Sequence, residues 1–142
     1  MVPRTRIPAV ALPAPRPAHD RPSTASVERV GQWAVLITLR GEVDLVTAPA
    51  VDAALRAGLA VPDVLVLVVD LSEVDFLAAA GLSALVAARD TAAARAIDLR
   101  LVADGRPVLR LLDVTGLRRT FRLHRDLAEP LGPHGHRSAS SL

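Results

Sequence analysis

The chain has 142 residues, of which 51% are hydrophobic, 23% charged and 2% aromatic, and its formal net charge is +2. This length fits one domain with tails, and the lack of cysteine excludes a disulfide framework and a thiolate metal site. The basic residues are all arginine and alternate with acids rather than with aromatics, so the composition does not indicate nucleic-acid binding.

The two ends of the chain differ in composition from its middle. Residues 1–25 contain six of the eleven prolines, and proline fixes φ and removes a backbone donor. We therefore predict a disordered or extended leader there. Residues 132–142, rich in Gly, His and Ser, predict a flexible tail. The folded domain is expected over residues 26–131.

The first half of the domain predicts a strand followed by a helix. Alternating apolar residues within 26–40 indicate strand structure with one buried face. Residues 41–44 break this pattern and predict a turn or bulge. A helix is expected over 48–60, with Thr47 as its N-cap and Pro49 in its first turn, where a missing N–H costs little.

The central stretch predicts a buried strand, a loop and a helix. Residues 64–69 are apolar without interruption, which is typical of a strand covered on both faces. This strand is expected to end at Asp70, with a loop over 71–77 and a helix over 79–94. Open α/β sheets bind their ligands at the carboxyl ends of the strands. We therefore expect the functional site in this loop.

The remaining elements complete an α/β pattern. A strand is expected over 97–103, then a short helix that Pro107 opens and Gly116 ends. A last short strand within 117–124 and one or two helical turns over 126–130 follow. The alternation of strands and helices predicts a mostly parallel sheet with helical crossovers.

The sequence offers little support for catalysis, metal binding or membrane insertion. It has no Gly-x-Ser-x-Gly motif and no glycine-rich phosphate loop before Gly81. His134 and His136 lie in a glycine-rich tail without neighbouring acids. No apolar run reaches about 18 residues, and the N-terminal stretch is a poor signal peptide. We expect a cytoplasmic protein that is not an enzyme and uses neither a cofactor nor a metal.

The start of the helix over 79–94 is unusual. Unpaired N–H groups and a partial positive charge at such a terminus can hold an anion. Here Ala78, Ala79 and Ala80 occupy the positions where a capping or phosphorylatable hydroxyl would be useful, and losing a Ser or Asp cap costs about 1 kcal/mol. Phe76 and Leu77 beside them either pack under the sheet edge or form a contact patch.

These residues resemble a known family. Residues 70–82 resemble the signature of STAS domains, especially anti-sigma factor antagonists, which runs roughly D-L-S-x-V-x-F-[LIM]-D-S-[ST]-G-[LI]. Residues 41–45 are similar to the family's G-E-[LV]-D segment, and residues 108–121 to its late helix, G-L pair and final strand. The resemblance covers about 27–131. It implies a single STAS-like α/β domain with a small mixed, mostly parallel sheet of four to five strands and about four helices.

The resemblance implies a protein-binding regulator in a partner-switching pathway. Family members bind an anti-sigma factor that is also a serine kinase, a histidine-kinase-like ATPase, and so release the sigma factor. The kinase phosphorylates the first Ser of D-S-[ST]-G, and the added charge abolishes binding. In this chain the Asp falls on Ala78, the phosphorylated Ser on Ala79 and the second hydroxyl on Ala80, whereas Gly81 is kept. Phosphorylation at this position is therefore impossible.

Two consequences compete. The chain is either a constitutive antagonist, held in the partner-binding form, or a STAS fold whose recognition motif has decayed. Loss of the Asp together with the Ser favours the second. Retention of Asp44, Asp75, Phe76 and Gly81 favours the first, which is the one we expect. The expected partner-binding surface consists of Asp44, Asp75, Phe76, Leu77, Ala78, Ala79 and Gly81.

Other roles stay open at this point. One alternative is a scaffold or regulatory subunit in a stressosome-like or transporter-associated complex, with other STAS proteins as partners. A second is a nucleotide-binding regulatory module, which the lack of a phosphate loop disfavours. Ser72, Ser83 and Thr91 are candidate substitute phosphorylation sites, although a loop hydroxyl bonded to its own backbone explains the first and an ordinary helix surface the other two.

Overall fold

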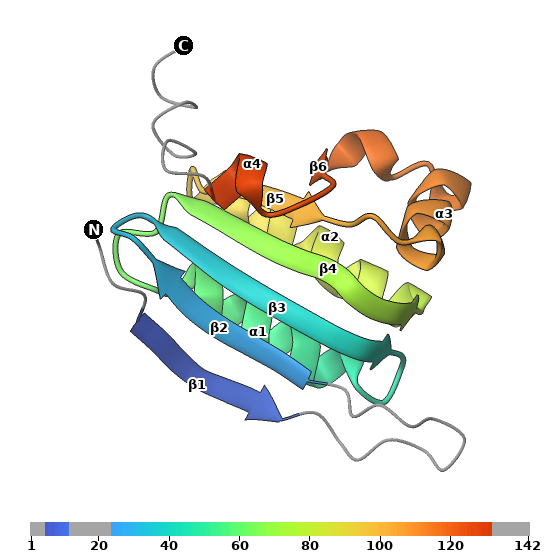
Figure 1. Cartoon of the computed structure of the whole chain (residues 1–142), viewed down its shortest axis with the longest axis horizontal. Coiled ribbons are helices and arrows are strands. Elements are labelled where there is room, and N and C mark those ends of the chain that lie inside the picture. Colours follow the sequence, from blue (N-terminus) through green and yellow to red (C-terminus); the bar gives the residue numbers. More distant parts are fainter. Residues whose placement is uncertain (1–4, 12–23, 132–142) are drawn as a thin grey trace.

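The computed structural model describes residues 5–11 and 24–131, and for residues 5–11 it describes the backbone. Six strands form one sheet in the order β1-β2-β3-β4-β5-β6. The first three strands pair antiparallel, and β3 to β6 pair parallel (Figure 1). Their bounds are β1 Thr5–Ala11, β2 Thr24–Val30, β3 Ala34–Val43, β4 Val66–Leu77, β5 Asp98–Val102 and β6 Arg122–His124.

Helices cover both faces of this sheet, but unequally. Their bounds are α1 Ala48–Leu59, α2 Ala79–Ala94, α3 Arg106–Thr115 and α4 Ala128–Leu131. In Figure 1, α1 and α2 lie behind the sheet, and the main core fills the space between them and the strands. A smaller apolar cluster on β3, β4 and β5 packs against Leu127 and Leu131 at α4.

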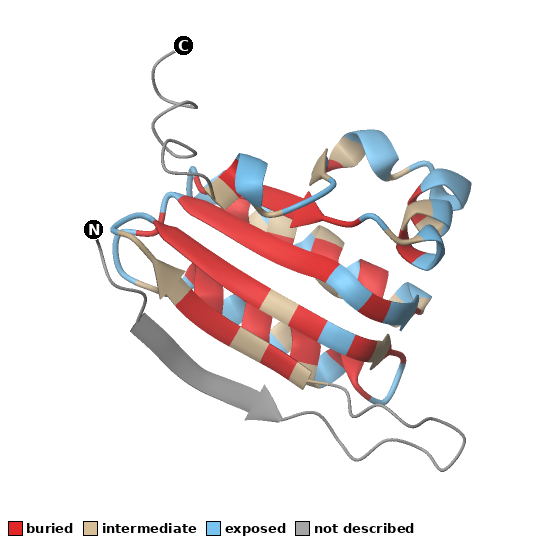
Figure 2. Ribbon diagram, viewed as in Figure 1, coloured by how far each residue is buried: buried red, intermediate tan, exposed pale blue. Residues whose placement is uncertain are grey.

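The core forms because alternate residues of the central strands point toward α1 and α2. Ile37, Leu39 and Leu67 are fully buried, and burying such a side chain contributes about 1.5–3 kcal/mol each. Figure 2 shows that β3 and β4 are buried along most of their length, and that exposed residues alternate with buried ones only toward their carboxyl ends. The exposed part of the central strands is therefore confined to one end of the sheet.

The structure confirms the α/β class and most of the predicted helices. Helix α2 spans the predicted residues 79–94. Helix α3 contains Pro107 in its first turn and ends at Gly116, whose φ of +76° is the left-handed conformation that favours glycine. Thr47 occupies the N-cap position of α1, but its side chain makes no capping hydrogen bond.

For residues 5–11, the predicted disordered or extended leader is corrected to a strand. Within residues 1–25, β1 forms a strand that pairs antiparallel with β2, so the sheet has one strand more than the predicted four to five. Pro8 falls where the register shifts between Ile7 and Val10, and proline is tolerated at bulges and on edge strands because a ladder donor is not needed there. The predicted tail over 132–142 lies outside the described residues.

The prediction of a loop over 71–77 is wrong, because these residues extend β4. The pairing of β4 with β3 continues through two register shifts, so the extra residues of β4 are taken up as bulges. Leu71, Val74 and Leu77 remain buried along this extension. The region predicted as strand material over 26–40 forms two strands, β2 and β3, joined by a turn that includes Gly31 at a φ of +74°.

Candidate functional site

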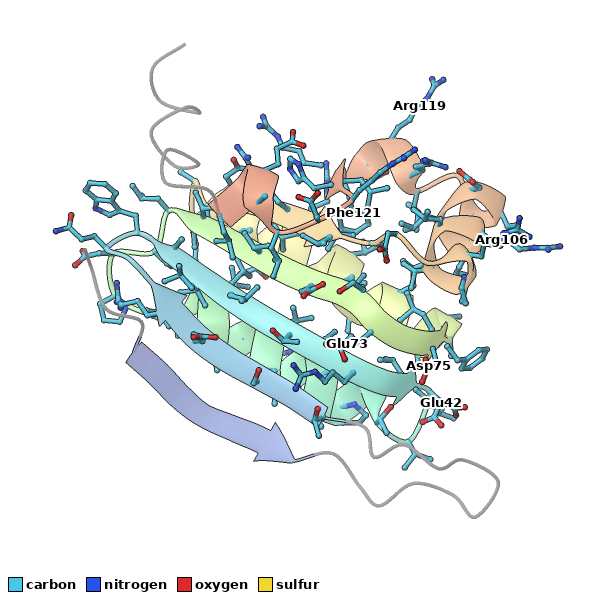
Figure 3. All side chains as sticks on the ribbon, viewed as in Figure 1. Glu42, Glu73, Asp75, Arg106, Arg119 and Phe121 are labelled. Carbon is cyan, nitrogen blue, oxygen red and sulfur yellow. The ribbon has the colours of Figure 1, made fainter. Side chains whose placement is uncertain are left out.

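The expected site lies at the carboxyl ends of β3 and β4. Val43 and Leu77 pair at the end of the two strands, and the Ala78 N–H donates to the Val43 carbonyl at 2.8 Å. The connection from β3 to α1 and the start of α2 therefore lie side by side. Figure 3 shows Glu42 and Asp75 together at this end of the sheet.

Asp44 stabilises the turn that connects β3 to α1 through side-chain hydrogen bonds. Its Oδ1 accepts hydrogen bonds from the backbone N–H groups of Val46 at 3.0 Å and Thr47 at 3.1 Å. The Asp44 N–H donates to Thr47 Oγ1 at 2.9 Å, and this hydroxyl donates to the Glu42 carbonyl at 3.2 Å. Asp44 is buried, so the structure gives it the role of a turn residue.

This closed turn displays two apolar side chains that the sequence reasoning missed. Leu45 is 79% exposed and Val46 is 63% exposed. Both lie between the two residues whose hydrogen bonds fix the turn, so their side chains are directed away from the core. The sequence signal was an apolar pair inside a turn that begins with Asp and ends with Thr.

The sequence left open whether Phe76 and Leu77 pack under the sheet edge or form a contact patch, and the structure shows that the two residues differ. Phe76 is 49% exposed, whereas Leu77 is only 4% exposed and belongs to the main core. Leu77 therefore packs under the sheet edge, and Phe76 is on the surface. Asp75 is also exposed.

The start of α2 is an uncapped helix end. Ala78 has extended backbone angles and no side-chain capping hydrogen bond. Ala79 is exposed, and Ala80 is half-buried. Gly81 is buried, and a Cβ added to it would lie 2.5 Å from Val43 Cγ1 and 2.7 Å from Leu77 Cδ1. Gly81 is thus required for the close packing of α2 on the strand ends.

The structure brings the predicted residues together but separates them by role. Asp44, Leu77 and Gly81 are buried and support the site, and the other predicted residues lie on its surface. We define the apolar edge as the surface at these strand ends formed by Leu45, Val46, Phe76, Ala78 and Ala79.

The candidate substitute phosphorylation sites differ in exposure. Ser72 is exposed, and its hydroxyl donates to Asp70 Oδ1 at 2.6 Å, while its N–H donates to the same oxygen at 2.9 Å. This is the local side-chain bonding expected of a hydroxyl at a bulge. Ser83 is exposed one turn after Ala79 on α2, and Thr91 is half-buried.

Over residues 5–11 and 24–131 there is no group of three or more His, Cys, Asp or Glu side chains arranged to hold a metal ion. In the same part of the chain, no helix combines the length and the apolar character that a membrane span requires. His134 and His136 lie outside the described residues.

Replacing Asp44 should destabilise the turn that displays Leu45 and Val46. We expect Asp44→Ala to lower the free energy of unfolding by about 1–3 kcal/mol, because two backbone donors lose their acceptor. Asp44→Asn keeps an acceptor oxygen and should lose less. Chemical denaturation measures both variants, and equal stability of Asp44→Ala and the wild type would contradict this role.

Enlarging Gly81 should push α2 away from the strand ends. We expect Gly81→Ala to cost about 1–3 kcal/mol of stability through overpacking. Since the nearest atom belongs to Val43, the double variant Gly81→Ala/Val43→Ala should lose less than the sum of the two single losses. Denaturant titrations of all three proteins test this, and additive losses would show that the contact is not the cause.

Comparisons with known proteins agree with this geometry. A family model described as STAS domain matches residues 22–129, which run from just before β2 into α4. The anti-sigma-F factor antagonist RsfB of Mycobacterium tuberculosis is 38% identical over 96 residues, which are 68% of this chain and 77% of RsfB.

Solved structures show the same fold. A crystal structure of an anti-sigma factor antagonist from Mycobacterium paratuberculosis matches with a TM-score of 0.69 and 34% identity, covering 77% of this chain and 91% of that one. Unphosphorylated SpoIIAA, an anti-sigma factor antagonist, matches with a TM-score of 0.60 and 16% identity, covering 83% and 99% of the two chains, which supports the fold alone. On the family model and these relatives, the chain belongs to the STAS domain family.

Proposed function

We propose that this chain is a cytoplasmic anti-sigma factor antagonist that binds an anti-sigma factor of the serine-kinase type without being phosphorylated at the usual position. The observation that carries the proposal is the apolar edge, which combines exposed apolar side chains with alanine at the position of the family's phosphorylated serine. The antagonists among its relatives support the same role.

The apolar edge has the character of a protein-binding surface. Aromatic residues are enriched in protein interfaces, and a few well-packed anchors carry most of the binding energy. Phe76 is the one aromatic side chain of this edge and is half exposed, with Leu45 and Val46 exposed on the neighbouring turn. We assign Phe76 as the anchor and the two turn residues as its apolar surroundings.

Alanine at position 79 removes the usual means of release. A phosphoserine carries a charge of about −1.5 to −2 and disrupts an apolar interface through desolvation. Ala79 has no oxygen to accept the phosphate, so a kinase partner cannot terminate binding there. This favours a constitutive antagonist over a decayed site, since the exposed apolar side chains around Ala79 are still present.

The direct test is a pull-down in which the full chain is the bait and the lysate comes from the cells that produce it. The intact mass of the recovered chain is then measured. We expect mass spectrometry to identify a histidine-kinase-like ATPase and the chain to carry no phosphate. That ATPase is then purified, and its affinity is measured in solution. Recovery of other STAS proteins or of a membrane complex, without such an ATPase, would contradict the proposal and favour a scaffold.

A carboxylate at position 79 should weaken partner binding. We expect Ala79→Glu to reduce the affinity for the purified ATPase by at least about tenfold, because a charge would be buried against an apolar partner surface. Glutamate is favourable at a helix N-terminus, so the variant should fold. Ala87→Glu, at an exposed position further along α2, is the matched control and should bind normally. Unchanged affinity of Ala79→Glu would remove the apolar edge from the proposed interface.

A hydroxyl at position 79 should restore the switch. Incubated with the ATPase and ATP, Ala79→Ser should gain the mass of one phosphate group and lose binding. The wild type under the same conditions should do neither. Phosphate on wild-type Ser72, Ser83 or Thr91 together with loss of binding would show that the switch has moved rather than disappeared.

A further inference from the structure

Helix α3 carries two arginines where helix stability disfavours them. Arg106 and Arg110 lie in its first half, the first turn contains no acidic residue, and the last turn contains no basic residue. The N-terminal end of a helix is the positive end of its dipole, and like charges one turn apart repel each other. Arg106 is therefore unfavourable at the positive end of the helix, and Arg110, one turn further on, adds a like-charge repulsion to it.

Contacts with the rest of the described chain do not compensate for this cost. Arg118 pairs with Asp113 at 3.1 Å, and Arg122 lies 3.7 Å from Asp98. Arg106 and Arg110, like Arg119 and Arg125, are exposed and form no ion pair or side-chain hydrogen bond with any residue of 5–11 or 24–131. Figure 3 shows the Arg106 side chain pointing away from the body of the protein. Residues that break a local stability rule are expected at functional or strained sites, and the position of α3 decides between the two.

The start of α3 lies at the same edge of the sheet as the apolar edge. Because β3, β4 and β5 are parallel, the connections that follow them all emerge at the carboxyl end. These connections lead to α1, α2 and α3 in turn. Helix α3 also packs against β4, and Figure 1 shows it at the end where β3 and β4 terminate.

We propose that Arg106 and Arg110 form a basic flank of the partner-binding surface and bind an acidic stretch of the anti-sigma factor. This inference rests on the proposed function and adds the chemistry of the partner. A guanidinium group binds a carboxylate through two parallel hydrogen bonds. Opposite charges across an interface raise the association rate and fix the orientation of the partner. The acidic stretch is expected beside the part of the partner that covers Phe76.

Charge reversal tests this flank. We expect Arg106→Glu/Arg110→Glu to lower the affinity for the purified ATPase by about tenfold or more at low salt, mainly through slower association. The difference from the wild type should shrink as salt is added, because salt screens exposed charges. Arg106→Lys/Arg110→Lys keeps the charge but loses the two parallel hydrogen bonds, so it should keep the salt dependence and lose less affinity than the charge reversal.

The matched control is Arg56→Glu/Arg95→Glu. It changes the net charge equally but lies in the last turn of α1 and at the C-cap of α2, toward the opposite ends of these helices. It should bind within about threefold of the wild type. Denaturation curves for every variant confirm that each remains folded at the temperature of the binding experiment.

The outcomes separate this inference from the function on which it rests. If Ala79→Glu weakens binding but Arg106→Glu/Arg110→Glu binds like the wild type at all salt concentrations, the basic flank is wrong and the antagonist role stands. An equal loss in the control variant would also overturn it, because net charge alone would then explain the effect. If the wild-type chain binds no such ATPase, the proposed function itself fails.

Discussion

The close packing of Gly81 against the paired ends of β3 and β4 is the constraint on which the site depends. With no Cβ at this position, α2 begins directly over Val43 and Leu77. This brings the uncapped start of α2 beside the turn from β3 to α1, so two segments far apart in the sequence form one surface. A larger residue would meet Val43 and Leu77 and so separate these two segments.

Supporting and exposed residues alternate within a few positions along the chain. Asp44 fixes the turn while its neighbour Leu45 is on the surface, and Leu77 fills the core while Phe76 is exposed. The signature that identifies the family therefore mixes residues that hold the fold with residues that could meet a partner. Stability and binding measurements on the same variant are needed to separate the two roles.

Sequence reasoning succeeded where structure is determined locally and failed where it depends on pairing. The limits of α2 follow from its unbroken alanine-rich helical pattern, and the end of α3 follows from Gly116. Strand β1 was missed because proline content indicated disorder, whereas pairing with β2 is a long-range interaction. The extension of β4 over 71–77 was missed because bulges break the alternation of buried residues. The exposure of Leu45 was missed because its sequence signal, an apolar pair between Asp44 and Thr47, indicates the hydrogen bonds of the turn only indirectly.

Under the proposed function, alanine at positions 78, 79 and 80 changes what can regulate binding. An antagonist with a serine at position 79 is released by its own partner, so its occupancy depends on kinase and phosphatase activity. A chain with alanine there binds according to concentration and affinity alone, since binding follows mass action. Under the proposed function, control then passes to the amount of this chain in the cell. Affinity that rests partly on an exposed arginine flank also makes binding sensitive to ionic strength.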